Sequence, residues 1–366
     1  MVKVDVEHIR TTDAFLSGQF ASYHVYPYYP DYLNYMDDIS GYTDPSGQIN
    51  TYYAYLKTLV DHHSMPVVIS EYGTSSSRGM TQYDRNTGRN QGGLSEQEQG
   101  QAIVDCYRDI MAAGCAGSVI FTWQDEWFKR TWNTMHAVDL TKTPYWSDYR
   151  TNEQYFGLLS FDPGEERSVS YVDGDLEEWT EDDIIQQDET SSISMKYDEK
   201  FLYFLVWQEG FSDGAQTLYL PVDVTPKTGS TYCEDYDLKF EDPADFLMII
   251  DGRENSRVLV QRRYNVLRAM YFHETDGEDP YESVPDKDMP VFDTIRLILQ
   301  TATALEEDNP DATSETYETG LLTYGNANPS SPDFNSLADF CFAGDYVEIK
   351  IPWQMFNFCS PAERMV

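Results

Sequence analysis

The run "PVVISEYG" at residues 66–73 constrains the fold more than any other stretch of this chain. Residues 67–70 favour β structure and are followed closely by a glycine, which is typical of a short buried strand in a parallel sheet covered on both faces. Glu71 comes at the end of this predicted strand. A glutamate there is either simply solvated or held at the sheet edge for chemistry, and the spacing alone leaves both interpretations open.

The first 165 residues alternate between strand and helix patterns. Strands are expected to start near residues 21, 66 and 117, and the opening "VKVDVEHI" predicts one more. Between the first two of these lies a helical stretch with an apolar stripe along residues 52–60. These features predict an α/β region.

A second helix is predicted to begin after Ser95, because Ser95 and Glu98 form a capping-box pattern. It should end at Gly114, the residue type that most readily takes the left-handed conformation of a helix terminus. The polar, glycine-rich residues 74–94 before it predict a loop.

From about residue 168 the chain consists of short β-rich runs separated by turn residues, which predicts an antiparallel β-sandwich. The runs are "SISMKYDEKFLYFLVWQEG", "QTLYLPVDVTP", "ADFLMIIDG", "SRVLVQRRY" and "DYVEIKIPW". Acidic stretches at residues 274–290 and 306–318 are expected to be surface loops. The sequence thus predicts two domains, at residues 1–165 and 168–366.

The net charge of −38, from 63 acidic and 25 basic residues, argues against nucleic acid as a partner, because phosphate binding needs clustered Lys and Arg. Five cysteines occur without CxxC spacing, so neither a zinc site nor a disulfide scaffold is indicated. No run approaches the roughly 18 apolar residues of a membrane span. Residues 1–15 lack the apolar core of a signal peptide.

Residues at or just after the predicted strand ends are mostly aromatic or acidic: His24, Tyr26, Glu71, Tyr72, Trp123, Glu126 and Trp127. In a βα-barrel the carboxyl ends of all strands open onto the face that carries the active site. A carboxylate among aromatic rings suits sugar chemistry, since the rings stack on sugars and the carboxylate attacks or stabilises the anomeric carbon.

Three segments, "SYHVYPYYPDYLN", "MPVVISEYGTSS" and "GSVIFTWQDEWFKRTWN", resemble strands six, seven and eight of the clan A (β/α)8-barrel glycoside hydrolases. The resemblance implies a partial (β/α)8 TIM barrel, strands five to eight, over residues 1–165. It makes Glu71 the catalytic nucleophile and places Trp123 at the sugar-binding floor. His24 and Tyr26 take the strand-six position, and Tyr72, Glu126 and Trp127 are the neighbouring substrate-binding candidates.

A retaining glycosidase also needs an acid/base carboxyl group about 5 to 5.5 Å from the nucleophile. In that clan it ends strand four, which this chain lacks, so we expect it upstream of Met1 and expect the chain alone to be nearly inactive. Glu7 and Glu126 are substitutes, whereas the Asn152–Glu153 pair is assigned to a barrel-closing tail. The chain is expected to start within a fold. Residues 1–165 alone should dimerise, stay partly molten or need the missing half-barrel.

The second region is similar to β-sandwich modules of the family 9 carbohydrate-binding type, in "YVDGDLEEW", "YDEKFLYFLV", "PVDVTPKTGS" and "VEIKIPW". Those modules continue further, so this end is also expected to be cut short. The likeness makes Trp179, Trp207 and Tyr219 either sugar-stacking or core aromatics. Asp173 and Asp175 are either calcium ligands or turn residues. Such a module implies a carbohydrate partner and an extracellular or cell-surface location.

Two functions remain open: a fragment of a retaining glycoside hydrolase acting on a poly- or oligosaccharide, or a non-catalytic carbohydrate-binding protein with a degenerate barrel. No cofactor is expected, since GxSxG, Walker and dinucleotide motifs are missing. No metal site is expected either, because His62 and His63 are adjacent at a predicted helix end and His136 is isolated.

Overall fold

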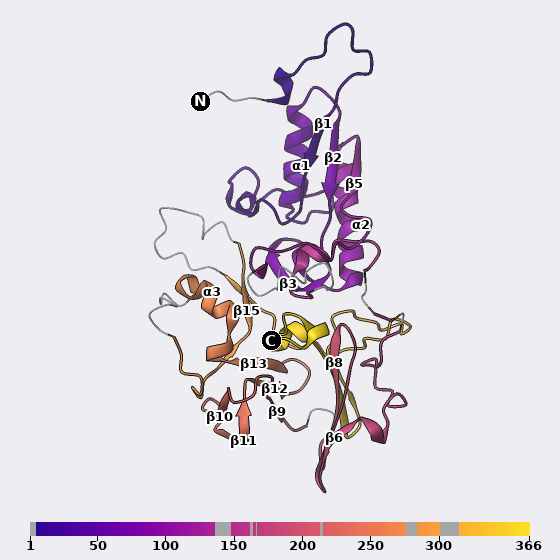
Figure 1. Cartoon of the computed structure of the whole chain (residues 1–366). Coiled ribbons are helices and arrows are strands. Elements are labelled where there is room, and N and C mark those ends of the chain that lie inside the picture. Colours follow the sequence, from indigo (N-terminus) through magenta and orange to yellow (C-terminus); the bar gives the residue numbers. More distant parts are fainter. Residues whose placement is uncertain are drawn as a thin grey trace.

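The computed structural model describes residues 5–135, 148–161, 164–165, 167–212, 215–275, 284–300 and 315–366. His136 lies outside these residues, as do residues 276–283 and 306–314 of the two expected acidic loops. Within them the chain forms three α-helices and 18 β-strands (Figure 1). The α-helices are α1 (Thr51–His62), α2 (Glu96–Ala113) and α3 (Val266–Thr275).

A three-stranded parallel sheet organises the first region. Its strands are β1 (Ala21–His24), β2 (Val67–Tyr72) and β5 (Gly117–Ile120), in the order β1-β2-β5. Side chains alternate along β2, so Val67 and Ile69 are buried against α1 and α2 while Val68 and Ser70 stay partly exposed. The three strands therefore start where the sequence predicts, but the second face of this sheet is less completely covered than expected.

The predicted boundaries of α2 are confirmed. Ser95 accepts a hydrogen bond from the Glu98 backbone N–H, and the Glu98 carboxylate accepts one from the Ser95 backbone N–H. Gly114 ends the helix with φ of 93°. Only part of the predicted apolar face of α2 is buried. Ile103 and Ile110 pack with α1 in the core. Three other apolar side chains of α2 are exposed: Val104, Tyr107 and Met111.

The expected partial (β/α)8 barrel is wrong. The described chain is mostly sheet with three helices, and β1 and β5 are the two free edges of an open sheet, so no closed barrel forms there. The fourth predicted parallel strand is also missing from the described residues, because Val6–His8 is a single 3-10 turn and residues 1–4 lie outside them.

Residues 74–94 are not entirely the loop that their composition predicts. They include a buried antiparallel hairpin of β3 (Ser77–Gln82) and β4 (Gln91–Leu94). Gly79 permits this burial, since a β-carbon there would lie 1.7 Å from the carbonyl oxygen of Arg150. Polar residues thus become interior because other backbone segments cross close to the glycines.

The second region contains two antiparallel sheets. One has the order β17 (Phe340–Ala343), β18 (Tyr346–Pro352), β8 (Phe201–Gln208), β7 (Ser191–Tyr197) and β6 (Ile184–Gln187). The other has the order β14 (Phe292–Thr294), β13 (Arg257–Gln261), β12 (Phe246–Ile250) and β9 (Leu218–Val222). Two-stranded ribbons are formed by β10 (Ser230–Cys233) with β11 (Leu238–Ala244), and β15 (Arg296–Ile298) with β16 (Thr316–Glu318).

Inward side chains of both sheets share one hydrophobic core, with Phe204 on β8 and Ile349 on β18 clustering with Met248 on β12 and Val260 on β13. This arrangement is compatible with the expected sandwich. The predicted strands of the five β-rich runs are present, whereas α3 was not predicted. None of the described helices has both the length and the apolar character that crossing a membrane requires.

The hairpin of β3 and β4 connects the two regions, and Figure 1 places β3 between the parallel sheet and the β-rich part. Arg78 forms a buried ion pair with Asp339 and donates hydrogen bonds to the carbonyl oxygens of Thr319 and Leu321. Asn133 Nδ2 donates to the carbonyl oxygen of Ile298 at 2.8 Å. Polar contacts over more than 160 residues of sequence therefore hold the regions together.

Candidate active site

Glu71 lies near the end of β2, beside the end of β1. The two strands are parallel and neighbours, with His24 in register with Glu71, so their carboxyl ends meet at one edge of the sheet. Glu71 Oε2 accepts a hydrogen bond from the Tyr26 hydroxyl at 3.0 Å and lies 3.0 Å from His24 Nδ1. The sequence correctly placed these three side chains together.

An open pocket of about 510 Å³ lies in front of Glu71. Its lining comes from both regions of the chain: Tyr26, Tyr28, Tyr29, Glu71, Thr81, Gln82, Gln91, Phe121, Lys129, Arg130, Thr131, Trp132, Glu153, Phe156 and Gln300. Aromatic rings, two carboxyl groups and cationic side chains thus converge on one space. Such a wall can stack on sugar rings and hydrogen-bond their hydroxyl groups.

Glu153 is the second carboxyl group of this pocket. It belongs to the 3-10 turn Asn152–Gln154, and Gln91 donates a hydrogen bond to it while Lys129 Nζ lies 4.0 Å from its Oε2. Burial raises the pKa of Glu153, and the carboxylates of Glu126 and Glu71 raise it further against the opposing effects of Lys129 and Gln91. The pKa of Glu153 therefore lies above that of a solvated glutamate, and Glu153 lines the same pocket as Glu71.

Tyr26 is held as a neutral hydrogen-bond donor. Burial raises its pKa well above the usual range, and the adjacent Glu71 carboxylate adds to the shift. Its ring meets Phe156 edge-on, with ring centroids 6.1 Å apart. Packing and the hydroxyl bond together orient the Glu71 carboxylate.

Lys129 links the acidic side chains of the site. Its ammonium group is 2.8 Å from Glu126 and 4.2 Å from the centroid of the Phe121 ring. It therefore supplies positive charge near Glu153 without neutralising Glu71 directly.

The structure separates other predicted site residues from the described pocket lining. Tyr72 is 2% exposed and packs in the core with α1 and α2, because it alternates with Glu71 to the opposite face of β2. Trp123 is 69% exposed. Trp127 stacks on Phe161, with ring centroids 4.1 Å apart. None of these three side chains lines the pocket.

The two substitutes for the acid/base group also fall elsewhere. Glu7 hydrogen-bonds Ser64, which precedes β2, whereas Glu71 lies near its far end, roughly 13 Å along the strand. Glu126 pairs with Lys129 and influences Glu153 through its charge but is not part of the described lining. Glu153 was the residue that sequence reasoning assigned to a tail, although its Asn-Glu pair was visible there.

The predicted sugar and calcium residues of the second region have structural partners. Trp179 Nε1 donates to Glu348 Oε1 at 3.0 Å. Asp173 Oδ1 accepts from the backbone N–H of Asp175, the geometry of a local turn. Trp207 and Tyr219, by contrast, line an apolar groove of about 820 Å³ beside the two large sheets.

Comparison with known proteins finds no matching family model, no similar curated protein and no similar solved structure.

Proposed function

We propose that this chain hydrolyses or transfers glycosyl units of a poly- or oligosaccharide with retention of configuration. The proposal rests chiefly on one observation: Glu71, oriented by Tyr26, shares an aromatic pocket with Glu153, a partly buried carboxyl group whose pKa is raised. A retaining glycosidase uses two carboxyl groups that face one site, one as the nucleophile and the other as the acid and then the base.

In the first step the Glu71 carboxylate attacks the anomeric carbon while the glycosidic C–O bond breaks and the leaving oxygen takes the Glu153 proton. In the second step water attacks the same carbon, Glu153 takes the water proton, and the ester bond to Glu71 breaks. Tyr26 donates to Glu71 throughout. The exposed rings of Tyr29 and Trp132 offer stacking surfaces at the mouth of the pocket.

Glu153→Gln should lower turnover of glycosides with poor leaving groups by about 10²- to 10⁴-fold. Wild-type turnover should fall as pH rises through the Glu153 pKa, which burial raises above the usual range of a glutamate, because the acid must be protonated. Glu153→Gln has no acidic proton at this position, so its turnover should lack this decline at high pH, the alkaline limb of the pH profile. Rates measured from pH 4 to pH 9 with a dinitrophenyl and a methyl glycoside test both statements.

Glu126→Gln is the matched comparison, since Glu126 shares Lys129 with Glu153 but does not line the described pocket. It should keep the alkaline limb and the dependence on leaving group. If Glu153→Gln retains both, Glu153 is not the acid.

A second candidate function, glycan binding without cleavage, is favoured by the groove that contains Trp207 and Tyr219. Tyr219 is 38% exposed and its ring centroid lies 5.6 Å from that of Tyr236. Replacing Trp207 or Tyr219 with Ala should weaken retention on an immobilised glycan roughly two- to tenfold each. Affinity electrophoresis with soluble polysaccharides measures this, and unchanged mobility of both variants would count against the groove.

A further inference from the structure

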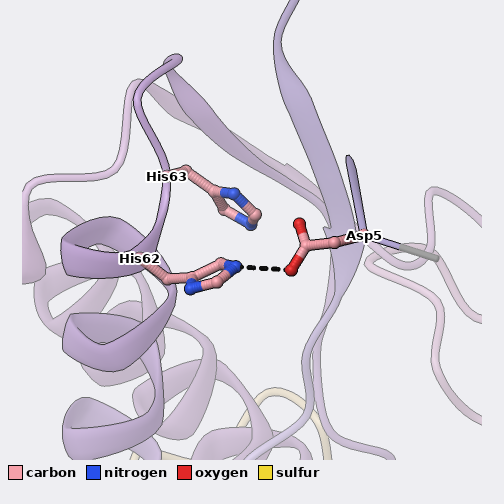
Figure 2. Close-up of side chains that lie close together, drawn as sticks. All are labelled: Asp5, His62 and His63. Carbon is pink, nitrogen blue, oxygen red and sulfur yellow. Dashed lines mark hydrogen bonds and ion pairs between the residues drawn. The ribbon is translucent and has the colours of Figure 1, made fainter. Parts of the chain in front are cut away.

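Three side chains converge at the end of α1, far from the pocket along β2. The ligand atoms that Asp5, His62 and His63 offer all lie within 4.8 Å of one another. Figure 2 shows both imidazole rings and the Asp5 carboxylate pointing toward the same space. His62 Nε2 is 2.7 Å from Asp5 Oδ2, whereas the sequence alone placed no carboxylate near the two histidines.

Glu7 prepares His63 to act as a ligand. The His63 ring donates from Nδ1 to Glu7 Oε1 at 3.2 Å, and the backbone and hydroxyl of Ser64 hold that carboxylate in place. This pairing assigns the proton to Nδ1, so Nε2 carries a lone pair, which accepts the Tyr23 hydroxyl at 2.6 Å. A carboxylate behind a histidine is the arrangement that orients metal-bound imidazoles.

The unequal exposure of the two histidine side chains would let a metal ion reach this cluster from solvent. The His63 side chain is 1% exposed and therefore fixed, while the His62 side chain is 52% exposed and opens the cluster to solvent. A buried ligand with an accessible partner lets a cation enter without unfolding the chain.

We propose that Asp5, His62 and His63 bind a divalent transition-metal ion of the zinc type. Two imidazoles and a carboxylate suit such ions, whereas calcium and magnesium prefer oxygen ligands alone. On binding, His63 Nε2 exchanges its bond to Tyr23 for the metal, and the Tyr23 hydroxyl or a water completes a fourth position. The ion thereby ties the segment before β1 to the end of α1, independently of the glycosidase proposal.

Titration of the untagged chain with Co²⁺, followed by visible absorption and by competition with Zn²⁺, tests the site. Wild type should bind one equivalent, with ligand-field bands of a low-coordinate histidine site. His62→Ala and Asp5→Asn should each weaken binding at least tenfold, and Glu7→Gln by about 10- to 100-fold.

His24→Ala is the matched control, because it removes a histidine paired with a carboxylate at 3.0 Å outside the cluster. It should leave Co²⁺ affinity unchanged, and circular dichroism should show that all variants keep the wild-type fold. Absence of saturable binding by wild type, or wild-type affinity in both His62→Ala and Asp5→Asn, would overturn the proposal. Neither result depends on glycoside turnover.

Discussion

Glu71→Gln should lower glycoside turnover by about 10³-fold or more, whatever the leaving group. The amide keeps the size of the side chain and can still accept the Tyr26 hydroxyl bond. It cannot form the glycosyl ester, however, so the first displacement fails. Steady-state rates across a panel of aryl glycosides measure the loss.

A 2-deoxy-2-fluoroglycoside with a good leaving group gives a second, independent measurement. It should add one glycosyl mass to the peptide that contains Glu71, and no such adduct should form in Glu71→Gln. Glu181→Gln, at an exposed position of the second region, is the control and should match wild type. Unchanged turnover of Glu71→Gln, or labelling of another peptide, would refute the assigned nucleophile.

Turnover by the wild-type chain, measured beside glycan retention, separates the two candidate functions. If the chain only binds carbohydrate through the groove at Trp207 and Tyr219, Glu71→Gln should retain wild-type affinity and no substrate should be turned over. If it is a glycosidase, the same substitution should leave binding largely intact while turnover disappears.

Arg78→Met should lower the free energy of unfolding by about 3–5 kcal/mol, because it breaks the buried ion pair with Asp339. The side chains of Arg78 and Asp339 are 8% and 3% exposed. The substitution also removes donors to the carbonyl oxygens of Thr319 and Leu321. Urea denaturation, with the midpoint and the slope fitted separately, measures the change.

The matched control is Arg167→Met, which removes an arginine that is 74% exposed and 3.3 Å from Glu178. Exposed pairs contribute only about 0–1 kcal/mol, so this variant should unfold close to wild type. The double variant Arg78→Met with Asp339→Asn should recover part of the loss, since it also removes the buried charge whose ion-pair partner is lost. Equal stability of Arg78→Met and Arg167→Met would contradict this account.

Local signals in the sequence predicted local structure well. The Ser95 capping box and Gly114 fixed both ends of α2, and apolar runs located β2, β8, β12 and β18. These features depend on interactions between residues close in sequence, so a single chain displays them.

Long-range packing was not predictable in the same way. The polar composition of residues 74–94 predicts a loop. Their burial depends on the close approach of Arg150 to Gly79, a contact between segments 71 residues apart. The barrel expectation failed for a related reason: three β and α patterns in order do not determine whether the sheet edges pair with each other. Glu153 was visible as an Asn-Glu pair, but its entry into the pocket depends on that same packing.

One wall of the pocket belongs to a segment more than 200 residues beyond Glu71. Gln300 lines the pocket, its backbone N–H donates to the Thr81 carbonyl oxygen at 3.0 Å, and Gln82 donates to its side chain at 3.4 Å. Exchange of the carboxyl-terminal region by recombination would therefore remodel the space in front of Glu71. Evolution of substrate preference here can act through the segment around β15 without altering any strand of the parallel sheet.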